Sequence, residues 1–509
     1  MAGAGDRAEL SEVVDFLSRS EAYCGEPVER IDTHISHVFL LCDRVYKMKR
    51  AVRLDFVDYS SLAKRLAYCR REIAANRSYA EALYRGVVAV TRQDETLAID
   101  GLGKPVEWLV QMARFDSGTQ FDHMVQDGRL SERHVTALAD RIAAVHRTSR
   151  REVEQGRVQQ LAFFRRYIGK HLIQARSRDE NVGSPLRWAA LLKRETARSA
   201  AKIEARRRHG FVRRIHGDMH LANICLFQNQ PTPFDAIEFD DAIACGDVLY
   251  DLAFPLMDLI RFERRDLANL LLNRYLAWTR DYGGLGLLPL FVSLRAGIRA
   301  MATALGPPGT DRTALIATFE TLAIDALMWR SAEPRLIAIG GLSGSGKSRA
   351  AADLALRLAR GPGAVVLRSD VIRKRLFELT PEQYLGPDAY RAEVNHRIYS
   401  RMLRDAARAL GNQQTVLLDA TFMDEADRRR VEALAERLAV PFTGIWLEAP
   451  LDVLRARVSA RFGDASDATV EVLDKQVERG TGLLAWRSVD ASGTPDQTQG
   501  NALEAIRSG

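Results

Sequence analysis

The segment GLSGSGKS at residues 341–348 constrains the fold more than any other part of this sequence. It fits the pattern G-x-x-x-x-G-K-[ST], in which backbone N–H groups close around a phosphate and glycine permits that close approach. The apolar stretch RLIAIG precedes the segment, and a helical pattern follows it. The sequence therefore predicts a strand, a phosphate-binding loop and a helix in that order.

The loop residues have predicted roles in binding a nucleotide. Lys347 is expected to reach the β and γ oxygens of the nucleotide, and the hydroxyl of Ser348 is expected to bind Mg²⁺. The N-terminus of the following helix adds positive potential at the phosphates. The other loop residues expected to bind the nucleotide are Gly341, Ser343, Gly344, Ser345 and Gly346.

A length of 509 residues predicts more than one domain, because a single hydrophobic core stops growing well below that size. The polar junction at 326–334 is interpreted as a linker between a first domain at 1–325 and a second domain at 335–490. In the second domain strands alternate with helices, which predicts an α/β fold with a parallel sheet. Residues 491–509 are rich in Ser, Gly, Gln and Asp and are expected to be disordered.

Two carboxylates and three arginines are candidate functional residues of the second domain. Asp370 follows a predicted strand and is expected to accept a hydroxyl proton, while Arg373, one helical turn away, is expected to hold an acidic substrate or the phosphoryl group. Asp419 ends the next predicted strand and is expected to support Mg²⁺ or orient the substrate. Arg457 and Arg461 share a helical face, as in a lid that stabilises charge. Helix capping by the aspartates and a solvated surface for the arginines remain alternatives.

With these residues, the segment 335–488 resembles small P-loop kinases of the family that includes polynucleotide 5′-kinase, gluconate kinase, chloramphenicol phosphotransferase and zeta-toxin-like enzymes. The resemblance rests on the loop, on Asp370 with Arg373, and on the arginine lid. It implies phosphorylation of a hydroxyl group by ATP. It leaves open which hydroxyl group is phosphorylated.

The first domain contains the segment HGDMHLANICLF at 216–227, with the spacing H-x-D-x-x-x-x-N. This spacing lets Asp218 accept a hydroxyl proton while the amide oxygen of Asn223 binds Mg²⁺. Further along, residues 246–253 read GDVLYDLA. The two segments resemble those of the aminoglycoside and choline phosphotransferase family, whose fold is similar to that of protein kinases. The resemblance implies an α+β fold for residues 1–325.

The same resemblance implies a metal-binding carboxylate and a lysine–glutamate pair over the nucleotide. Counting back from Gly246 places Glu238 where the family has its metal-binding Asp. The predicted pair is Lys47 with Glu72, and Lys49 is the alternative lysine because it lies on the same face of the predicted strand.

Two departures from this family favour weak or altered catalysis in the first domain. The first is the Glu at position 238, with Asp235 and Asp240 nearby. The second is the segment IDTHISHVFL, which contains no glycine where a phosphate-binding loop would be expected. Ser36 and backbone amides are expected to bind the phosphates there instead.

The composition argues against several classes of protein. The five cysteines form no C-x-x-C pair, and the longest apolar patch, at 284–294, is much shorter than a membrane span. The first residues do not read as a leader sequence, so the cytoplasm is the expected location and no membrane partner is expected. The net charge of +7 is spread among interleaved acidic residues without an aromatic surface, which disfavours nucleic acid as a partner.

The layout of the chain resembles that of proteins described as bifunctional aminoglycoside phosphotransferase/ATP-binding proteins. The predicted function is transfer of the ATP γ-phosphoryl group to a hydroxyl of a small molecule of sugar, amino sugar or nucleoside type. ATP and Mg²⁺ are the expected cofactors, at two nucleotide sites. One alternative is that the first domain is a degenerate, ligand-binding regulator of an active P-loop kinase. Another is phosphorylation of polynucleotide 5′-hydroxyl ends. The oligomeric state is left open.

Overall fold

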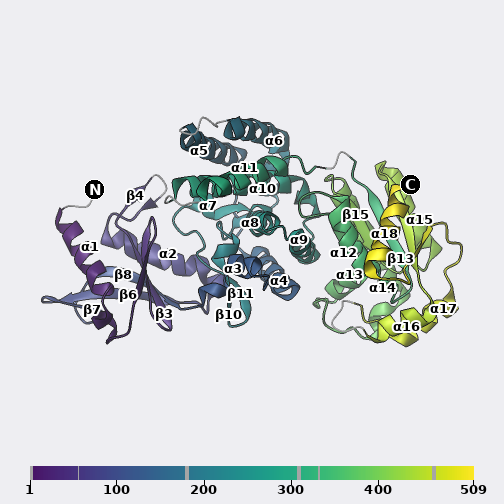
Figure 1. Ribbon diagram of the computed structural model, residues 1–509, viewed down its shortest axis with the longest axis horizontal. Helices are drawn as coiled ribbons and strands as arrows, with labels where there is room; N and C mark the ends of the chain where they lie inside the picture. The colour runs from purple at the N-terminus through teal and green to yellow at the C-terminus, as the bar shows by residue number, and fades with distance from the viewer. Residues whose placement is uncertain are drawn as a thin grey trace. The chain divides into compact units, whose positions relative to one another are not determined.

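The computed structural model describes residues 4–54, 57–177, 183–306, 311–330, 333–460 and 466–508. The chain divides into two compact units (Figure 1). The first unit comprises Met1–Arg166 and Thr196–Asp258, and the second comprises Tyr167–Glu195 and Leu259–Gly509. The second unit therefore contains helices that precede residue 330 as well as the predicted second domain.

The first unit begins with a six-stranded antiparallel sheet in the order β1-β2-β3-β8-β6-β7. Helix α1 (Ala4–Leu17) contributes Val13 and Leu17 to a buried cluster with side chains of this sheet. Helix α2 (Leu62–Ala80) contacts β6 and β8. The strands are β1 (Glu29–Asp32), β2 (Ser36–Leu40), β3 (Arg44–Lys49), β6 (Tyr84–Gln93), β7 (Thr96–Ile99) and β8 (Lys104–Ala113).

Strand β3 separates its side chains onto two faces, as the pleat of a strand requires. Tyr46 and Met48 are buried in the cluster with α1. Lys47 and Lys49 alternate with them and both bind Glu72 of α2. The alternation predicted from the sequence therefore places both lysines toward α2.

The rest of the first unit carries the HGD segment between short strands. These form two antiparallel pairs, β10–β11 and β12–β9. Their bounds are β9 (Val212–Arg214), β10 (Ile224–Phe227), β11 (Gln230–Pro233) and β12 (Cys245–Asp247). The helices between β8 and residue 261 are α3 (Phe121–Gln126), α4 (Glu132–Thr148), α5 (Val158–Arg176), α6 (Gly183–Arg208), α7 (Asp241–Ala244) and α8 (Val248–Arg261). Of these, the parts of α5 and α6 within 167–195 belong to the second unit.

Three further helices of the second unit follow α8: α9 (Arg265–Thr279), α10 (Leu288–Leu305) and α11 (Arg312–Ala326). Among the described residues, one helical stretch, Tyr282–Leu305, is long and apolar enough to cross a membrane. However, 78% of its apolar window is buried inside the structure. This burial is typical of a core helix, so the stretch is only weak evidence for a membrane span.

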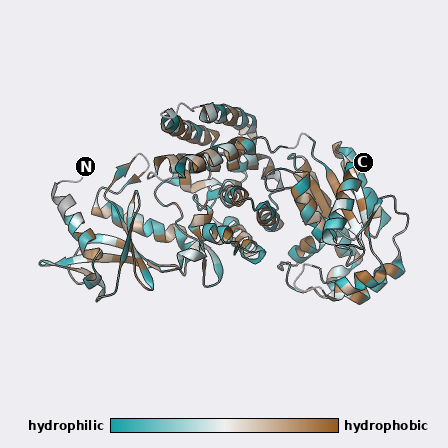
Figure 2. Cartoon of the chain, viewed as in Figure 1, coloured by the Kyte–Doolittle hydropathy of each residue, from teal (hydrophilic) through white to brown (hydrophobic). Residues whose placement is uncertain are grey.

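The second unit ends in a five-stranded, fully parallel sheet in the order β14-β15-β13-β16-β17. Its strands are among the hydrophobic, brown segments of Figure 2, while the helices around them show both colours. The strands are β13 (Leu336–Gly341), β14 (Val365–Arg368), β15 (Val416–Asp419), β16 (Phe442–Glu448) and β17 (Arg487–Asp490). The helices are α12 (Lys347–Leu358), α13 (Ser369–Leu376), α14 (Ala392–Leu410), α15 (Glu425–Leu438), α16 (Leu451–Ser459), α17 (Val470–Arg479) and α18 (Pro495–Arg507). The parallel sheet predicted from the strand–helix alternation is confirmed.

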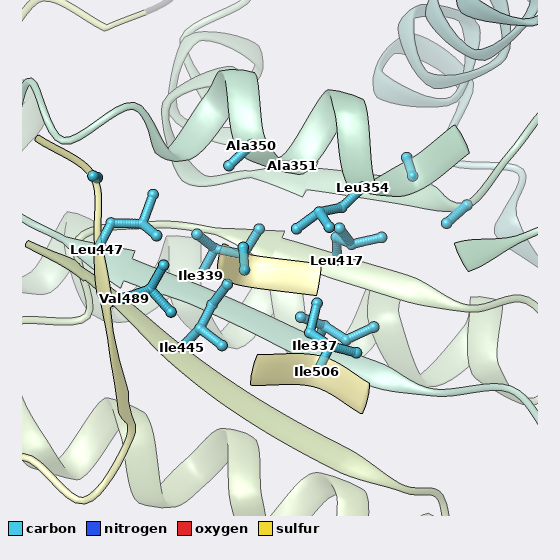
Figure 3. Packing of buried hydrophobic residues seen from close by; sticks show 14 residues of the cluster. Ile337, Ile339, Ala350, Ala351, Leu354, Leu417, Ile445, Leu447, Val489 and Ile506 are labelled. Carbon is cyan, nitrogen blue, oxygen red and sulfur yellow. The ribbon is translucent and has the colours of Figure 1, made fainter. Parts of the chain in front are cut away.

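The prediction of a disordered tail at 491–509 is wrong for the described part of that segment. Residues Pro495–Arg507 form α18, with a capping box at Thr494. Ile506 is fully buried against the sheet, in one cluster with Ile337 and Ile445 (Figure 3). The polar composition of α18 reflects its solvated face, and a few well-spaced apolar residues are enough to hold the helix on the sheet.

Candidate functional sites

The first candidate site is built around the two lysines of β3. Lys47 Nζ lies 2.9 Å from Glu72 Oε1, and Lys49 Nζ lies 2.6 Å from Glu72 Oε2. The single carboxylate of α2 thus joins both lysines. The structure contains the predicted Lys47–Glu72 pair, and it also gives the alternative residue Lys49 a contact with the same glutamate.

A second carboxylate distinguishes the two lysines. Lys47 Nζ is 2.5 Å from Asp235 Oδ1, and Lys49 Nζ is 2.5 Å from Glu238 Oε1. The hydroxyl of Tyr59 also donates to Glu238 Oε1, at 2.9 Å. The Asp235 side chain is 44% exposed, whereas that of Glu238 is 6% exposed. Asp235 can therefore meet a ligand that Glu238 cannot reach without breaking its buried contacts.

This geometry changes the interpretation of the predicted metal ligand Glu238. Its carboxylate holds Lys49 and Tyr59, and Asp235 takes the exposed place beside Lys47. Asp235 has a left-handed backbone, with φ of 63°. An aspartate tolerates this conformation better than most residues, and such strain is concentrated at functional sites. Asp235 lies two residues after β11, which ends at Pro233. The prediction of Glu238 rests on counting back from Gly246, across the stretch between β11 and β12, which contains no further strand.

The charges of this cluster support one another. Burial disfavours the charged form of Lys47, but Asp235 and Glu72 outweigh it and hold the pKa of Lys47 well above its usual range. Burial would raise the pKa of Glu72, but Lys47 and Lys49 lower it. Desolvation also works against ionisation of Asp235, but Lys47 outweighs it and lowers the pKa of that carboxyl. All these groups are therefore ionised near neutral pH.

The HGD segment forms a loop whose backbone is hydrogen-bonded to the side chain of Asp251 in α8. The carboxylate of Asp251 accepts hydrogen bonds of 2.9 Å from the backbone N–H groups of His216 and Gly217. Asn223 Nδ2 donates to Asp218 Oδ2 at 3.1 Å and to the Asp218 carbonyl at 2.9 Å. Because the amide nitrogen is turned toward Asp218, the amide oxygen of Asn223 is the atom left to bind a cation.

The loop also lies beside the Asp235 segment. The backbone N–H of Ile237 donates to the His216 carbonyl, and that of Phe234 donates to the Asn223 carbonyl, both at 2.9 Å. The segments that carry the predicted base Asp218, the predicted ligand Asn223 and the additional residue Asp235 are therefore hydrogen-bonded neighbours. Their oxygens are the hard donors that Mg²⁺ prefers. Ser36 is buried at 1% exposure, which does not suit its predicted contact with phosphates.

The second candidate site is the loop between β13 and α12. Gly341, Gly344 and Gly346 have φ of 141°, 86° and 88°. A Cβ at Gly344 would lie 2.6 Å from the Leu454 carbonyl oxygen, so both backbone conformation and space require glycine there. Lys347 Nζ donates to the Leu342 carbonyl at 2.7 Å, which folds the lysine over the loop.

Asp419 lies at the carboxyl end of β15, next to the loop. Ser348 Oγ donates to Asp419 Oδ2 at 2.7 Å, and Arg368 Nε donates to the same oxygen at 3.1 Å. The hydroxyl and the carboxylate predicted to support Mg²⁺ are therefore in contact. Their shared position, at the end of neighbouring parallel strands, is where open α/β sheets bind ligands.

Asp370 and Arg373 lie on α13, which follows β14. Burial raises the pKa of Asp370, although Arg368 opposes the shift. Arg373 is 6% exposed, donates to the Ala389 carbonyl at 2.6 Å and lies 4.5 Å from the ring centre of Tyr390. Arg373 is thus held by the segment after α13.

The predicted arginine lid differs from the structure. Arg457 donates to the carbonyls of Ala491 and Gly493, at 2.8 and 3.0 Å, and so holds the C-terminal segment. Arg461 lies outside the described residues. An additional contact comes from α17, where Gln476 accepts from the Ser343 N–H at 2.9 Å and donates to the Ser343 hydroxyl at 3.1 Å. No local pattern could have indicated Gln476, because it is 133 positions from Ser343.

The two units contain separate candidate phosphotransfer sites, and comparison with known proteins agrees with this division. Residues 59–288 match the phosphotransferase enzyme family, and residues 336–483 match an AAA domain family. The chain thus contains a region that matches the phosphotransferase enzyme family, followed by a region with a phosphate-binding loop and a parallel sheet that matches an AAA domain. The resemblances predicted from the motifs are confirmed at this level.

Relatives align with nearly the whole of this chain. Uncharacterized proteins of Mycobacterium bovis and Mycobacterium tuberculosis are 28% identical over 491 residues, which cover 94% of this chain and 95% of each relative. Similar solved structures include a choline kinase from Cryptosporidium parvum, 10% identical over 62% of this chain and 95% of that one, with a TM-score of 0.41. A gluconokinase from Sinorhizobium meliloti is 20% identical over 34% of this chain and 93% of that one, with a TM-score of 0.25.

Proposed function

We propose that the chain transfers the γ-phosphoryl group of ATP to a hydroxyl of a small molecule and that it has two nucleotide sites. The family matches support phosphotransfer in general. The observation that carries the finer proposal is that each unit has its own set of functional groups. Each set contains a phosphate-binding lysine, a candidate proton-accepting carboxylate and a pair of oxygens suited to a divalent cation.

In the first site, Asp218 accepts the proton of the attacking hydroxyl. Lys47, held by Glu72, binds the nucleotide phosphates. The contact of Lys47 with Asp235 supports a position for this lysine next to the cation site. Asn223 and Asp235 hold Mg²⁺, while Glu238 positions the lysines through Lys49 instead of binding the metal. This assignment removes one of the two reasons for regarding the first domain as a degenerate regulator.

In the second site, Asp370 accepts the hydroxyl proton and Arg373 orients the acceptor or the phosphoryl group. Lys347 binds the β and γ oxygens, for which it must leave the Leu342 carbonyl. Ser348 and Asp419 hold the cation, directly or through water. In both sites, Mg²⁺ would supply neutralisation of the charge that develops on the phosphate oxygens.

The acceptor class that we propose is a sugar, an amino sugar or a nucleoside, and the proposed location is the cytoplasm. The full-length chain is the right material for testing the acceptor, because helices before residue 330 and the P-loop domain belong to one compact unit. A screen would incubate ATP with members of each acceptor class. ADP release and the mass of the product would be measured for the natural sequence, for Asp218→Asn and for Lys347→Ala.

The proposal predicts that one group of acceptors loses phosphorylation in Asp218→Asn and another in Lys347→Ala. The control is Lys475→Ala, which removes an exposed lysine of the unit that contains Lys347 and should leave phosphorylation of every acceptor unchanged. Phosphorylation that survives in the Asp218→Asn, Lys347→Ala double variant would overturn both sites. If Asp218→Asn leaves every product unchanged, the first site is not catalytic.

A further inference from the structure

A cavity of about 990 Å³ lies in the second compact unit, away from the phosphate-binding loop. None of its lining residues belongs to 341–348. Part of its lining comes from α9, α10, α11 and residues 328–330. The lining also includes residues 357–363, at the end of α12, and residues 413–415, before β15. Its volume is at the upper end of the range usual for small-molecule sites, which commonly form where several structural elements meet.

The walls of the cavity are fixed by close packing around a turn after α12. Gly361 and Gly363 have φ of 59° and 93°. A Cβ on Gly361 would lie 2.5 Å from the ring of Trp329, so only glycine lets the indole pack there. Asn269 Nδ2 donates to the carbonyls of Pro362 and Ala364 at 2.8 and 3.0 Å, which ties α9 to this turn.

The lining of the cavity is strongly basic, with four arginines and one acidic residue, Asp325. Arg265 is committed to structure, because it donates to the carbonyls at the end of α12. Arg357 and Arg360 are exposed, and neither forms an ion pair with any residue that the structure describes. Two guanidinium groups of the lining are therefore available to an anion.

Arg330 provides a third basic group in the lining. Its Nη2 lies 2.6 Å from Glu195 Oε1, but its Nε is buried and has no hydrogen-bond partner among the described residues. A buried donor without a partner costs free energy, which a ligand oxygen would recover. The lining also contains the flat, apolar side chain of Trp329, together with Leu288 and Pro289.

We propose that this cavity binds a nucleotide-like ligand, that is, an aromatic ring carrying a phosphate or similar anionic group, at a third site separate from both phosphotransfer sites. Arg357 and Arg360 bind the anion. Trp329 and its apolar neighbours cover the ring. The side chains of Gln413 and Gln414, which also line the cavity, are suited to hydrogen bonds with the polar edge of a heterocycle.

The test uses 8-azido-AMP as a photoreactive probe on the full-length protein, with the labelled peptides located by mass spectrometry. Labelling of peptides that contain Trp329 or Gln413–Thr415 is expected, in competition with AMP. Adenosine and inorganic phosphate should each compete at least about tenfold more weakly, because each lacks one half of the ligand. The position of the label separates this site from the loop at 341–348 and from β3.

The variant Arg357→Ala, Arg360→Ala should reduce labelling at the cavity by about tenfold or more and leave labelling at 341–348 unchanged. The control, Arg429→Ala with Arg437→Ala, removes two exposed arginines elsewhere in the same unit and should not change the label. A lysine double variant, Arg357→Lys with Arg360→Lys, keeps the positive charge and should retain part of the labelling at the cavity. Labelling confined to the phosphotransfer sites, cavity labelling unaffected by loss of the two arginines, or equal competition by adenosine would overturn the proposal.

Discussion

Asp235 Oδ1 lies 2.5 Å from Lys47 Nζ, and the pair joins residues that are 188 positions apart. The lysine comes from the antiparallel sheet, and the aspartate comes from the segment after the β10–β11 hairpin. Glu72 holds the same ammonium group from α2. A lysine between two carboxylates is well placed to exchange one of them for a phosphate, because its charge remains compensated throughout.

We expect Asp235→Asn to reduce phosphorylation at the first site by roughly a hundredfold or more, because a transition-state contact through the cation is lost. Glu238→Gln should reduce it by less than that, since Glu238 acts through Lys49. Asp241→Asn, an exposed neighbour, is the matched control. The measurement is kcat/KM for an acceptor that depends on Asp218. An equal loss in folded Glu238→Gln would restore Glu238 as the metal ligand.

Glu238→Ala should destabilise the first unit by roughly 3 kcal/mol, because Lys49 is only 1% exposed and would keep just one of its two carboxylates. Urea denaturation followed by circular dichroism would measure the change. Lys64→Ala removes the lysine of the partly exposed Lys64–Asp58 ion pair and should lower the free energy of unfolding by less than about 1 kcal/mol. Similar costs for the two variants would show that the buried network contributes little to stability.

The second site should lose activity as the pH falls through the pKa of Asp370. Burial raises this pKa, and only the ionised carboxylate can accept a proton, so the acid limb should lie above the usual range of an aspartate. Arg368 lowers the pKa of Asp370, so Arg368→Gln should move the acid limb to higher pH. ATP turnover of Asp218→Asn variants against pH would measure this. A limb that stays in place or moves to lower pH would exclude Asp370 as the base.

The C-terminal helix makes a separate prediction about stability. Ile506→Ala should destabilise the P-loop domain by about 2–5 kcal/mol, because the side chain is fully buried against the sheet. Leu483→Ala, where the side chain is 74% exposed, should change stability by less than about 0.5 kcal/mol. Thermal unfolding of each full-length variant compares them. A neutral Ile506→Ala would mean that α18 does not pack in solution.

Several parts of the site could be predicted because their signal is local. The loop at 341–348 places its glycines and its lysine within one turn of backbone, so its spacing alone indicates the conformation. The same holds for Asp218 and Asn223, which the structure joins by hydrogen bonds. Alternation along β3 placed Lys47 and Lys49 on one face, but it could not distinguish them. Their second carboxylates come from a segment nearly 190 positions away.

The sequence by itself determined the phosphate-binding loop at 341–348, the HGD motif at 216–223, the order of the two domains and the parallel sheet. Each of these depends on residue spacing over a few turns of backbone or on the period of apolar residues. Only the tertiary structure decided that Asp235 faces Lys47, that Glu238 is buried on Lys49, and that α18 is ordered. These outcomes depend on which side chains meet across distant segments. Burial and charge pairing select those contacts only when the chain has folded.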